Sequence, residues 1–288
     1  MSAAPYAGQV AALASRHDKE RAIAPAFRRC LQITLEVVAV DTDAFGTFAG
    51  EIPRTDTPLN TAIAKARAGM RESGRSLGVA SEGTIGSDPL LPLVTSDIET
   101  IAFLDDDRDL IISETTRSTD IVAVRETVTP NSSLSRLLAI ADFPRHALIV
   151  RPGGAAIDQP AGSARTPIIK GITDKRALKR AIDECSALDG SAVVESDLRA
   201  CHSPSRMRNI RRCAQQLAER IARTCPECAS PGWGRITPIR GLPCSACGTN
   251  VDVAIRSDVY GCPSCPAYLE VPRAELSVEP RWCPFCNP

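Results

Sequence analysis

Eight of the twelve cysteines form four Cys-x-x-Cys pairs, and this pattern constrains the fold more than any other feature of the chain. All four pairs lie in the last quarter of the sequence: Cys225/Cys228, Cys244/Cys247, Cys262/Cys265 and Cys283/Cys286. Two residues between the cysteines let one tight turn direct both thiolates at one ion, and four thiolates are a usual ligand set of structural zinc. The sequence therefore predicts two structural Zn²⁺ ions in a C-terminal double zinc-ribbon module, residues 224–288.

The spacing leaves two pairings of these cysteines open. In the sequential pairing the first two pairs, 15 residues apart, hold one ion, and the last two pairs, 17 residues apart, hold the other. In a cross-braced pairing the first pair joins the third. Because both separations suit a four-cysteine ribbon, we expect the sequential pairing. A closed four-thiolate shell leaves no position for water, so these ions are expected to fold the module and not to catalyse.

Composition excludes several classes of protein. The 288 residues carry no formal net charge, which argues against disorder and against globally basic nucleic-acid binding. Apolar runs fall short of the roughly 20 residues that cross a bilayer, and the N-terminus lacks the pattern of a signal peptide. We therefore expect a cytoplasmic protein with no membrane partner. Only five of its 34 basic residues are lysines.

The order of elements upstream predicts an α/β domain over residues 1–223, with a mixed sheet and flanking helices. A loop or linker rich in glycine, alanine and proline is expected at about 151–167. The helix after Thr57-Pro58 has a clear start and stops at Gly74. The expected strands are Val10–Ala14, Leu35–Val40, Leu77–Ala80, a hairpin of Ile98–Leu104 with Leu110–Ser113, Ala147–Val150 and Ala192–Glu195.

Polar residues follow three of these strands, at the edge where open α/β sheets bind ligands. The first segment runs from Ser15 to Lys19, the second from Asp41 to Arg54, and the third from Ser81 to Gly86. Together they offer carboxylates for a divalent cation and cations for phosphate. The helix before the third strand adds Lys65 and Arg67.

These motifs resemble the nucleoside-triphosphate pyrophosphatase superfamily that removes inosine and xanthosine triphosphates, over roughly residues 8–105. Ser15 to Lys19 is similar to its phosphate loop, with His17 in place of an asparagine and the lysine one position early. Asn60-Thr61-Ala62-Ile63-Ala64-Lys65-Ala66-Arg67 resembles its helical motif, and Ala80-Ser81-Glu82-Gly83 its metal-binding strand end, with one carboxylate instead of two. With Glu195 to His202 and the cysteine-rich tail, the whole arrangement resembles a bacterial family without an assigned activity.

The resemblance implies metal-assisted hydrolysis of a phosphoanhydride in a nucleotide-like substrate. Glu82 and Glu51 would hold Mg²⁺ or Mn²⁺, and Lys19 and Lys65 would bind phosphates. The further substrate-binding candidates are Ser15, His17, Arg54 and Arg67. Each of these residues also has a plainer interpretation, such as a solvated helix position for Lys65 and Arg67 or a turn acid for Glu82.

A second group of polar residues follows the strand at Ala192: Glu195, Asp197, Arg199, His202 and Arg206. The two acids could share a metal with Glu82 if their strands are neighbours, and the histidine could carry a proton. The alternative is a charged turn whose ions pair with one another. The arginines of the following helix form either a phosphate-binding face or a solvated helix side.

Three functions remain open from the sequence. The first is a hydrolase of a nucleotide or another phosphate-containing small molecule, with the zinc ribbons for partner or substrate binding. The second is a non-enzymatic adaptor whose zinc ribbons bind nucleic acid or protein. The third is a metal-dependent nuclease that uses Glu195 and Asp197.

Overall fold

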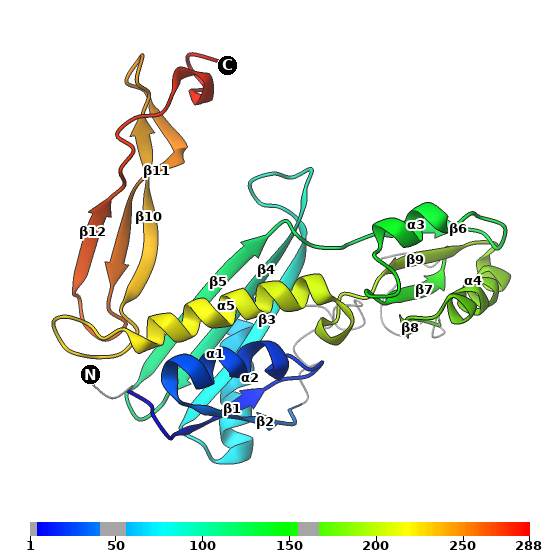
Figure 1. Cartoon of the computed structure of the whole chain (residues 1–288), viewed down its shortest axis with the longest axis horizontal. Helices are drawn as coiled ribbons and strands as arrows, with labels where there is room; N and C mark the ends of the chain where they lie inside the picture. The colour runs from blue at the N-terminus through cyan, green and yellow to red at the C-terminus, as the bar shows by residue number, and fades with distance from the viewer. Residues whose placement is uncertain (1–4, 41–55, 155–166) are drawn as a thin grey trace.

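The computed structural model describes residues 5–40, 56–154 and 167–288, and these form three sheets with five α-helices (Figure 1). The first sheet has the order β2-β1-β3-β4-β5. Its strands β1 (Val10–Ala14), β2 (Thr34–Val38) and β3 (Leu77–Ser87) are parallel, whereas β4 (Thr95–Asp105) and β5 (Leu110–Ser118) continue it antiparallel. The predicted α/β class with a mixed sheet is confirmed.

Helices cover both faces of this sheet, and each face has its own core. Helices α1 (Glu20–Leu31) and α5 (Pro204–Ala222) lie side by side on one face, over a core that includes Phe27, Phe103 and Leu217. Helix α2 (Pro58–Ser73) covers the other face, where Ala80 and Ala102 pack against it. Since side chains alternate along a strand, odd-numbered positions of β3 and β4 face α1 and α5, and even-numbered positions face α2.

Helix α2 has the boundaries that the sequence predicts. The Thr57 side chain accepts a hydrogen bond from the Asn60 N–H at 3.2 Å, and Pro58 occupies the first turn, where its missing N–H costs nothing. Gly74 ends the helix in the left-handed conformation, with φ of 66°.

Strand β3 is longer than the predicted Leu77–Ala80, and this changes the environment of the polar segment after it. Ala80 pairs with Ala14, the last residue of β1, so β3 runs on beyond the end of its parallel neighbour. Ser81 to Ser87 therefore belong to the strand, where they pair with β4. Ser81, Glu82 and Gly83 therefore lie beyond the end of β1, at a part of β3 that side chains from both faces of the sheet can reach.

A second, antiparallel sheet of order β6-β9-β7-β8 is built from residues between β5 and α5. Its strands are β6 (Arg125–Val128), β7 (Leu148–Pro152), β8 (Ile169–Ile172) and β9 (Ala192–Ser196). Helices α3 (Ser135–Ile140) and α4 (Lys175–Asp189) pack with it around a separate core. Most of the predicted linker, residues 155–166, lies outside the described residues.

The C-terminal residues form an arm that projects from the end of α5 (Figure 1). Its three antiparallel strands are β10 (Gly234–Pro243), β11 (Asn250–Gly261) and β12 (Tyr268–Pro272), and a 3₁₀ turn, Pro280–Trp282, lies near the C-terminus. Among the helices described, none combines the length and apolar character that a membrane span needs.

Candidate functional site

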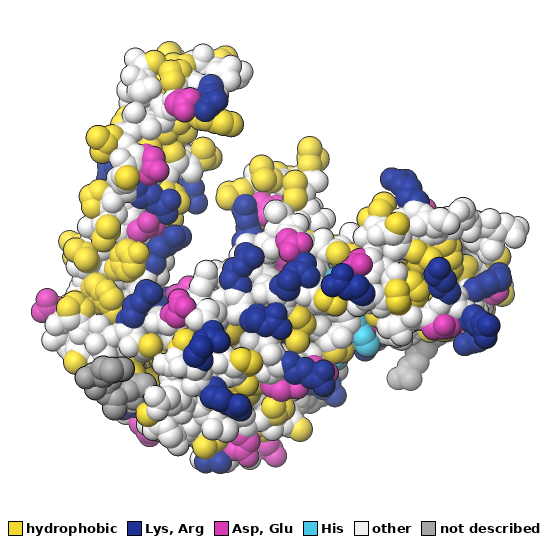
Figure 2. Space-filling view, in the orientation of Figure 1, with side chains coloured by type: hydrophobic (Ala, Val, Ile, Leu, Met, Phe, Trp, Pro, Cys, Tyr) yellow, Lys and Arg dark blue, Asp and Glu magenta, His cyan; other side chains and the backbone are white. Residues whose placement is uncertain are grey.

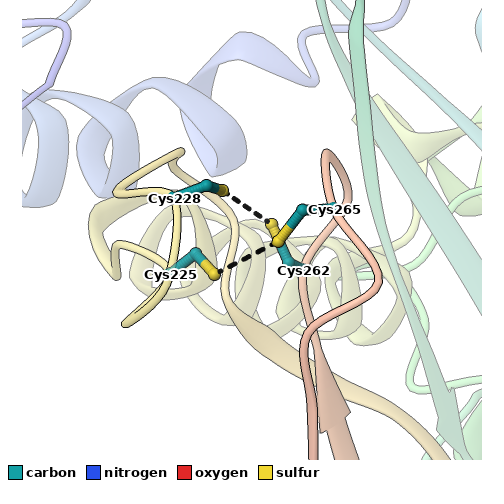
Figure 3. Close-up of side chains that lie close together, drawn as sticks. All are labelled: Cys225, Cys228, Cys262 and Cys265. Carbon is teal, nitrogen blue, oxygen red and sulfur yellow. Dashed lines mark hydrogen bonds between the residues drawn. The ribbon is translucent and has the colours of Figure 1, made fainter.

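The first cysteine cluster lies at the base of the arm and joins Cys225 and Cys228 to Cys262 and Cys265 (Figure 3). The Sγ atoms of Cys225 and Cys265 are 3.7 Å apart, and those of Cys228 and Cys262 are 3.6 Å apart. Sulfurs at the corners of a tetrahedron with Zn–S bonds of about 2.3 Å lie about 3.8 Å from one another. The cluster therefore has the spacing of a four-thiolate zinc site, and its sulfurs are too far apart for disulfides.

Each turn is shaped locally to direct its sulfurs at one point. The Glu227 N–H donates to Cys225 Sγ at 3.4 Å, and the Ser264 N–H donates to Cys262 Sγ at 3.3 Å. Such bonds favour the thiolate form that metals bind. Ala229 then turns the chain with φ of 59°.

The second cluster, Cys244, Cys247, Cys283 and Cys286, lies at the far end of the arm. Its Sγ atoms are 3.8 Å apart between Cys244 and Cys286 and 3.7 Å apart between Cys247 and Cys283. In each cluster all four sulfurs lie within 4.8 Å of one another. Both clusters fit the tetrahedral shell of zinc.

The expected sequential pairing is wrong, because the first cysteine pair joins the third and the second joins the fourth. The reason is the length of the β10–β11 hairpin. Ten extended residues of β10 span about 30 Å, so they carry the second cysteine pair far from the first. Strand β11 then returns the chain to the base, and the segment after β12 leads back to the tip.

The base of the arm is fastened to the first sheet through Arg220 of α5. Its Nε donates to the Gly232 carbonyl at 3.1 Å, and its Nη1 donates to Glu114 Oε1 on β5 at 3.0 Å. The first metal cluster therefore belongs to the body of the protein as well as to the arm.

A separate cluster of buried charges surrounds the part of β3 that extends beyond β1. Lys65 on α2 donates to Glu82 on β3, with Nζ and Oε2 2.6 Å apart. Only 8% of the Lys65 side chain and 6% of the Glu82 side chain are exposed. Three residues from different elements meet here, since Lys19 also reaches this strand.

Lys19 lies in the loop after β1, at the start of α1. Its Nζ donates to Ser81 Oγ at 3.0 Å and to the Ser81 carbonyl at 3.4 Å. Burial and, to a smaller extent, the nearby Arg206 charge lower its pKa to about 8, against the opposing effect of Glu99 and Glu82. Lys19 is therefore close to its titration range at neutral pH.

Arg206 and Glu99 form the second ion pair of the cluster. Arg206 Nε donates to Glu99 Oε1 at 2.5 Å, and its Nη1 donates to the Leu198 carbonyl at 2.7 Å. A β-carbon at Gly83 would lie 2.5 Å from Arg206 Nη2 and 2.5 Å from Glu99 Oε1. Glycine at this position therefore lets the pair lie across β3 beside Glu82.

Asp97 is fully buried two residues before Glu99, on the same face of β4. Within the described residues, neither oxygen of its carboxylate has a hydrogen-bond partner. Burial and the neighbouring Glu99 charge raise its pKa to about 7, against the opposing effect of Arg206. Asp97 and Glu99 were missed in the sequence, although acids at alternate positions leading into a predicted strand were the available signal.

Two other candidates of the first half, Arg67 and Ser15, have hydrogen-bond partners outside this cluster. Arg67 points elsewhere on α2 and pairs with Asp106 in the β4–β5 turn, at 3.3 Å. Ser15 is buried and its Oγ donates to the neighbouring Arg16 carbonyl at 3.4 Å, while His17 lies in the same loop with φ of 65°. Glu51 and Arg54 lie outside the described residues.

The second predicted group lies on the other sheet, so Glu195 and Asp197 do not share a site with Glu82. Strand β9 pairs with β6 and β7, not with β3. Glu195 pairs with Arg151 and with Arg125, the latter at 3.1 Å.

The acid nearer to α5 is held in a similar way. Asp197 Oδ2 accepts a hydrogen bond from Arg199 Nη2 at 2.5 Å and one from the Gly171 N–H at 3.0 Å. A β-carbon at Gly171 would lie 3.2 Å from His202 Nε2. Glu195, Asp197 and Arg199 line a cavity of about 330 Å³ between the two sheets, together with Ile85 and Gly86 of β3. These ion pairs are those expected from the alternative interpretation of this segment, a charged turn whose side chains pair with one another.

The buried charge cluster offers a catalytic divalent cation fewer ligands than each cysteine cluster offers zinc. In the part of the chain that the structure describes, the two cysteine clusters are the only groups of three or more metal-ligating side chains close enough to share an ion. Mg²⁺ is commonly held by one or two carboxylates with water and substrate phosphates completing its shell. Glu82 is the carboxylate of this cluster best placed for that role, next to cations that would bind phosphate.

The fold and the cysteine geometry define an α/β protein with a cross-braced arm of two four-cysteine metal sites. The chain belongs to the family described as a domain of unknown function, DUF6671, whose model matches residues 65–288. The match includes Lys65, Glu82, Arg206 and all eight metal-site cysteines, but not Lys19. No curated protein matches the chain significantly, and neither comparison adds support for the resemblance to the pyrophosphatases.

Proposed function

We propose that this protein is a metal-dependent hydrolase of a nucleotide-like phosphoanhydride. The observation that carries the proposal is the convergence of Lys19, Lys65 and Glu82 from three elements at the part of β3 beyond the end of β1. Burying charged side chains costs desolvation free energy, and clusters of buried charges are common at functional sites. The resemblance of the same three motifs to nucleoside-triphosphate pyrophosphatases supports the same reaction class.

In this reaction the chain's residues would bind and orient the phosphates. Lys19 and Lys65 would neutralise phosphate charge, and Glu82 would hold Mg²⁺ or Mn²⁺ once Lys65 turns toward the substrate. The cation would supply Lewis acidity and an oriented water. Arg206 would remain bound to Glu99 and keep the β3 edge in place.

The test is a hydrolysis screen of zinc-loaded protein against nucleoside triphosphates with Mg²⁺ or Mn²⁺. Glu82→Gln is expected to abolish turnover. Glu114→Gln is the matched control, because it neutralises a part-buried carboxylate whose partner, Arg220, lies outside the cluster. Absence of turnover in folded wild-type protein, or full activity in Glu82→Gln, would contradict the proposal.

A second candidate function, the adaptor, is favoured by the apolar surface of the arm. Large hydrophobic side chains at and near its tip are strongly exposed: Val253 by 76%, Leu276 by 83%, Trp282 by 66% and Phe285 by 74%. Exposed apolar groups gathered on one projecting element are typical of protein interaction sites. Loss of partner capture in a Trp282→Ser/Phe285→Ser variant with unchanged zinc content would support this function.

A further inference from the structure

Helices α1 and α5 together form a strongly basic face on a chain without net charge. Six of their eight arginines are exposed, and with the two glutamates of these helices they leave a net charge of +4, whereas the whole chain has a formal charge of zero. The two helices lie next to each other in the outer layer, and Figure 2 shows Lys and Arg side chains gathered over them. The positive charge of this protein is therefore concentrated locally.

Three of these arginines carry uncompensated charge. Arg28, Arg211 and Arg212 are exposed and have no ion pair within the described residues. Arg211 and Arg212 point away from the core that Ile210 and Ala214 enter. The three guanidinium groups are therefore available to an external anion.

The remaining charges of the face are weakly held. Arg208 pairs with Asp120 at 2.9 Å, with 47% and 70% of the two side chains exposed. Arg21 pairs with Asp18 at 3.5 Å, also at the surface. Exposed pairs of this kind contribute little to stability and open readily. The acids on the two helices themselves, Glu20 and Glu219, leave the excess of arginine in place.

The chemistry of the face points to phosphate. A planar guanidinium binds phosphate oxygens through two parallel hydrogen bonds, and lysine cannot do this. Both helices are fully described, and neither has an exposed large hydrophobic side chain. Insertion into a membrane surface or docking of an apolar peptide needs such residues, whereas a polyanion does not.

We propose that the α1–α5 face binds the phosphodiester backbone of a nucleic acid, with Arg28, Arg211 and Arg212 as its principal phosphate contacts. The face has no aromatic side chain on its exposed side, so recognition rests on the backbone and has little base preference. The inference does not depend on the proposed hydrolase, because these arginines lie outside the Lys19, Lys65 and Glu82 cluster.

The experiment measures binding of the full-length, zinc-loaded protein to a fluorescein-labelled single-stranded DNA by anisotropy across a salt series. Each phosphate contact contributes about 0.7 to the slope of log K against log salt for single strands. The variant Arg28→Gln/Arg211→Gln/Arg212→Gln is therefore expected to lower the slope by about 2. By the same relation its affinity at roughly 0.1 M salt falls about 100-fold.

The matched control removes the same charge from another basic helix. Lys175, Arg176 and Arg180 are exposed on α4, and their triple glutamine variant has the same change in net charge. The proposal expects this control to bind nearly as well as the wild type. Far-UV circular dichroism and zinc content establish that both variants are folded.

Three results would overturn the inference. The first is wild-type protein that does not bind the DNA. The second is an equal loss in the α1–α5 variant and the α4 control, which would reduce the effect to net charge. The third is binding to phosphatidylserine vesicles, lost in the α1–α5 variant, without any binding to DNA, which would assign the face to a membrane surface.

Discussion

The buried carboxyl of Asp97 predicts a pH dependence of stability that a single substitution should remove. Its pKa in the folded protein is about 7, above the ordinary 3.8, because burial and the Glu99 charge disfavour ionisation. The folded state therefore keeps a proton on Asp97 that the unfolded chain has already released. The contribution to stability is fully present below about pH 4 and is lost as the pH rises through 7.

The size of the effect follows from the pKa difference. Each pH unit between the two pKa values corresponds to about 1.4 kcal/mol, so raising the pH from about 5.5 to about 8.5 should remove about 2 kcal/mol. Asp97→Asn has nearly the same shape and no charge. Its free energy of unfolding should therefore exceed that of the wild type by a margin that grows by about 2 kcal/mol over this range.

Urea denaturation followed by far-UV circular dichroism at the two pH values measures this margin. The control is Glu72→Gln, which neutralises an exposed carboxylate on α2 and should change stability equally at both pH values. The pH dependence of the zinc sites affects all three proteins alike and cancels in the comparison. A margin that stays constant with pH, or shrinks as pH rises, would refute the claim that buried Asp97 keeps its proton in the folded protein up to about pH 7.

Three further outcomes follow from the structure. Cys244→Ser should reduce bound zinc from about two ions to about one per chain, measured by atomic absorption, while the thermal unfolding of the body stays unchanged, because the second cluster lies at the far tip of the arm. Lys65→Met should cost about 3 to 5 kcal/mol in urea denaturation, because the buried Glu82 carboxylate loses the ammonium that lies 2.6 Å from it, and adding Glu82→Leu should recover part of this loss. Gly83→Ala should destabilise the protein by about 1 to 3 kcal/mol, because the new methyl would lie 2.5 Å from the Glu99 carboxylate; an unchanged unfolding midpoint would contradict this packing.

Local signals in the sequence predicted helix α2 and the strands of the first sheet. Thr57-Pro58 and Gly74 bound α2 as expected, since capping depends on hydrogen bonds within a few residues. The predicted end of β3, at Ala80, was wrong because the end of this strand depends on pairing with a distant strand and not on local signals. Its polar residues look like a loop after a strand, but pairing with β4 extends the strand to Ser87.

The polar cluster was predictable only in part. Lys19, Lys65 and Glu82 stand in motifs that indicate phosphate chemistry, and they do meet. Glu99 and Arg206 are 107 positions apart, and their contact depends on α5 returning to the first sheet after the second sheet has formed. A similar distance effect misled the assignment of Glu195, whose strand belongs to the second sheet.

By itself the sequence determined the local chemistry of this protein: which cysteines form pairs with the spacing of metal ligands, where helix α2 is capped, and which strands alternate with helices. These properties depend on neighbours within a few residues. Tertiary structure alone decided which cysteine pairs share an ion and which charges meet across the sheet, because both depend on how long strands bring distant segments of the chain together.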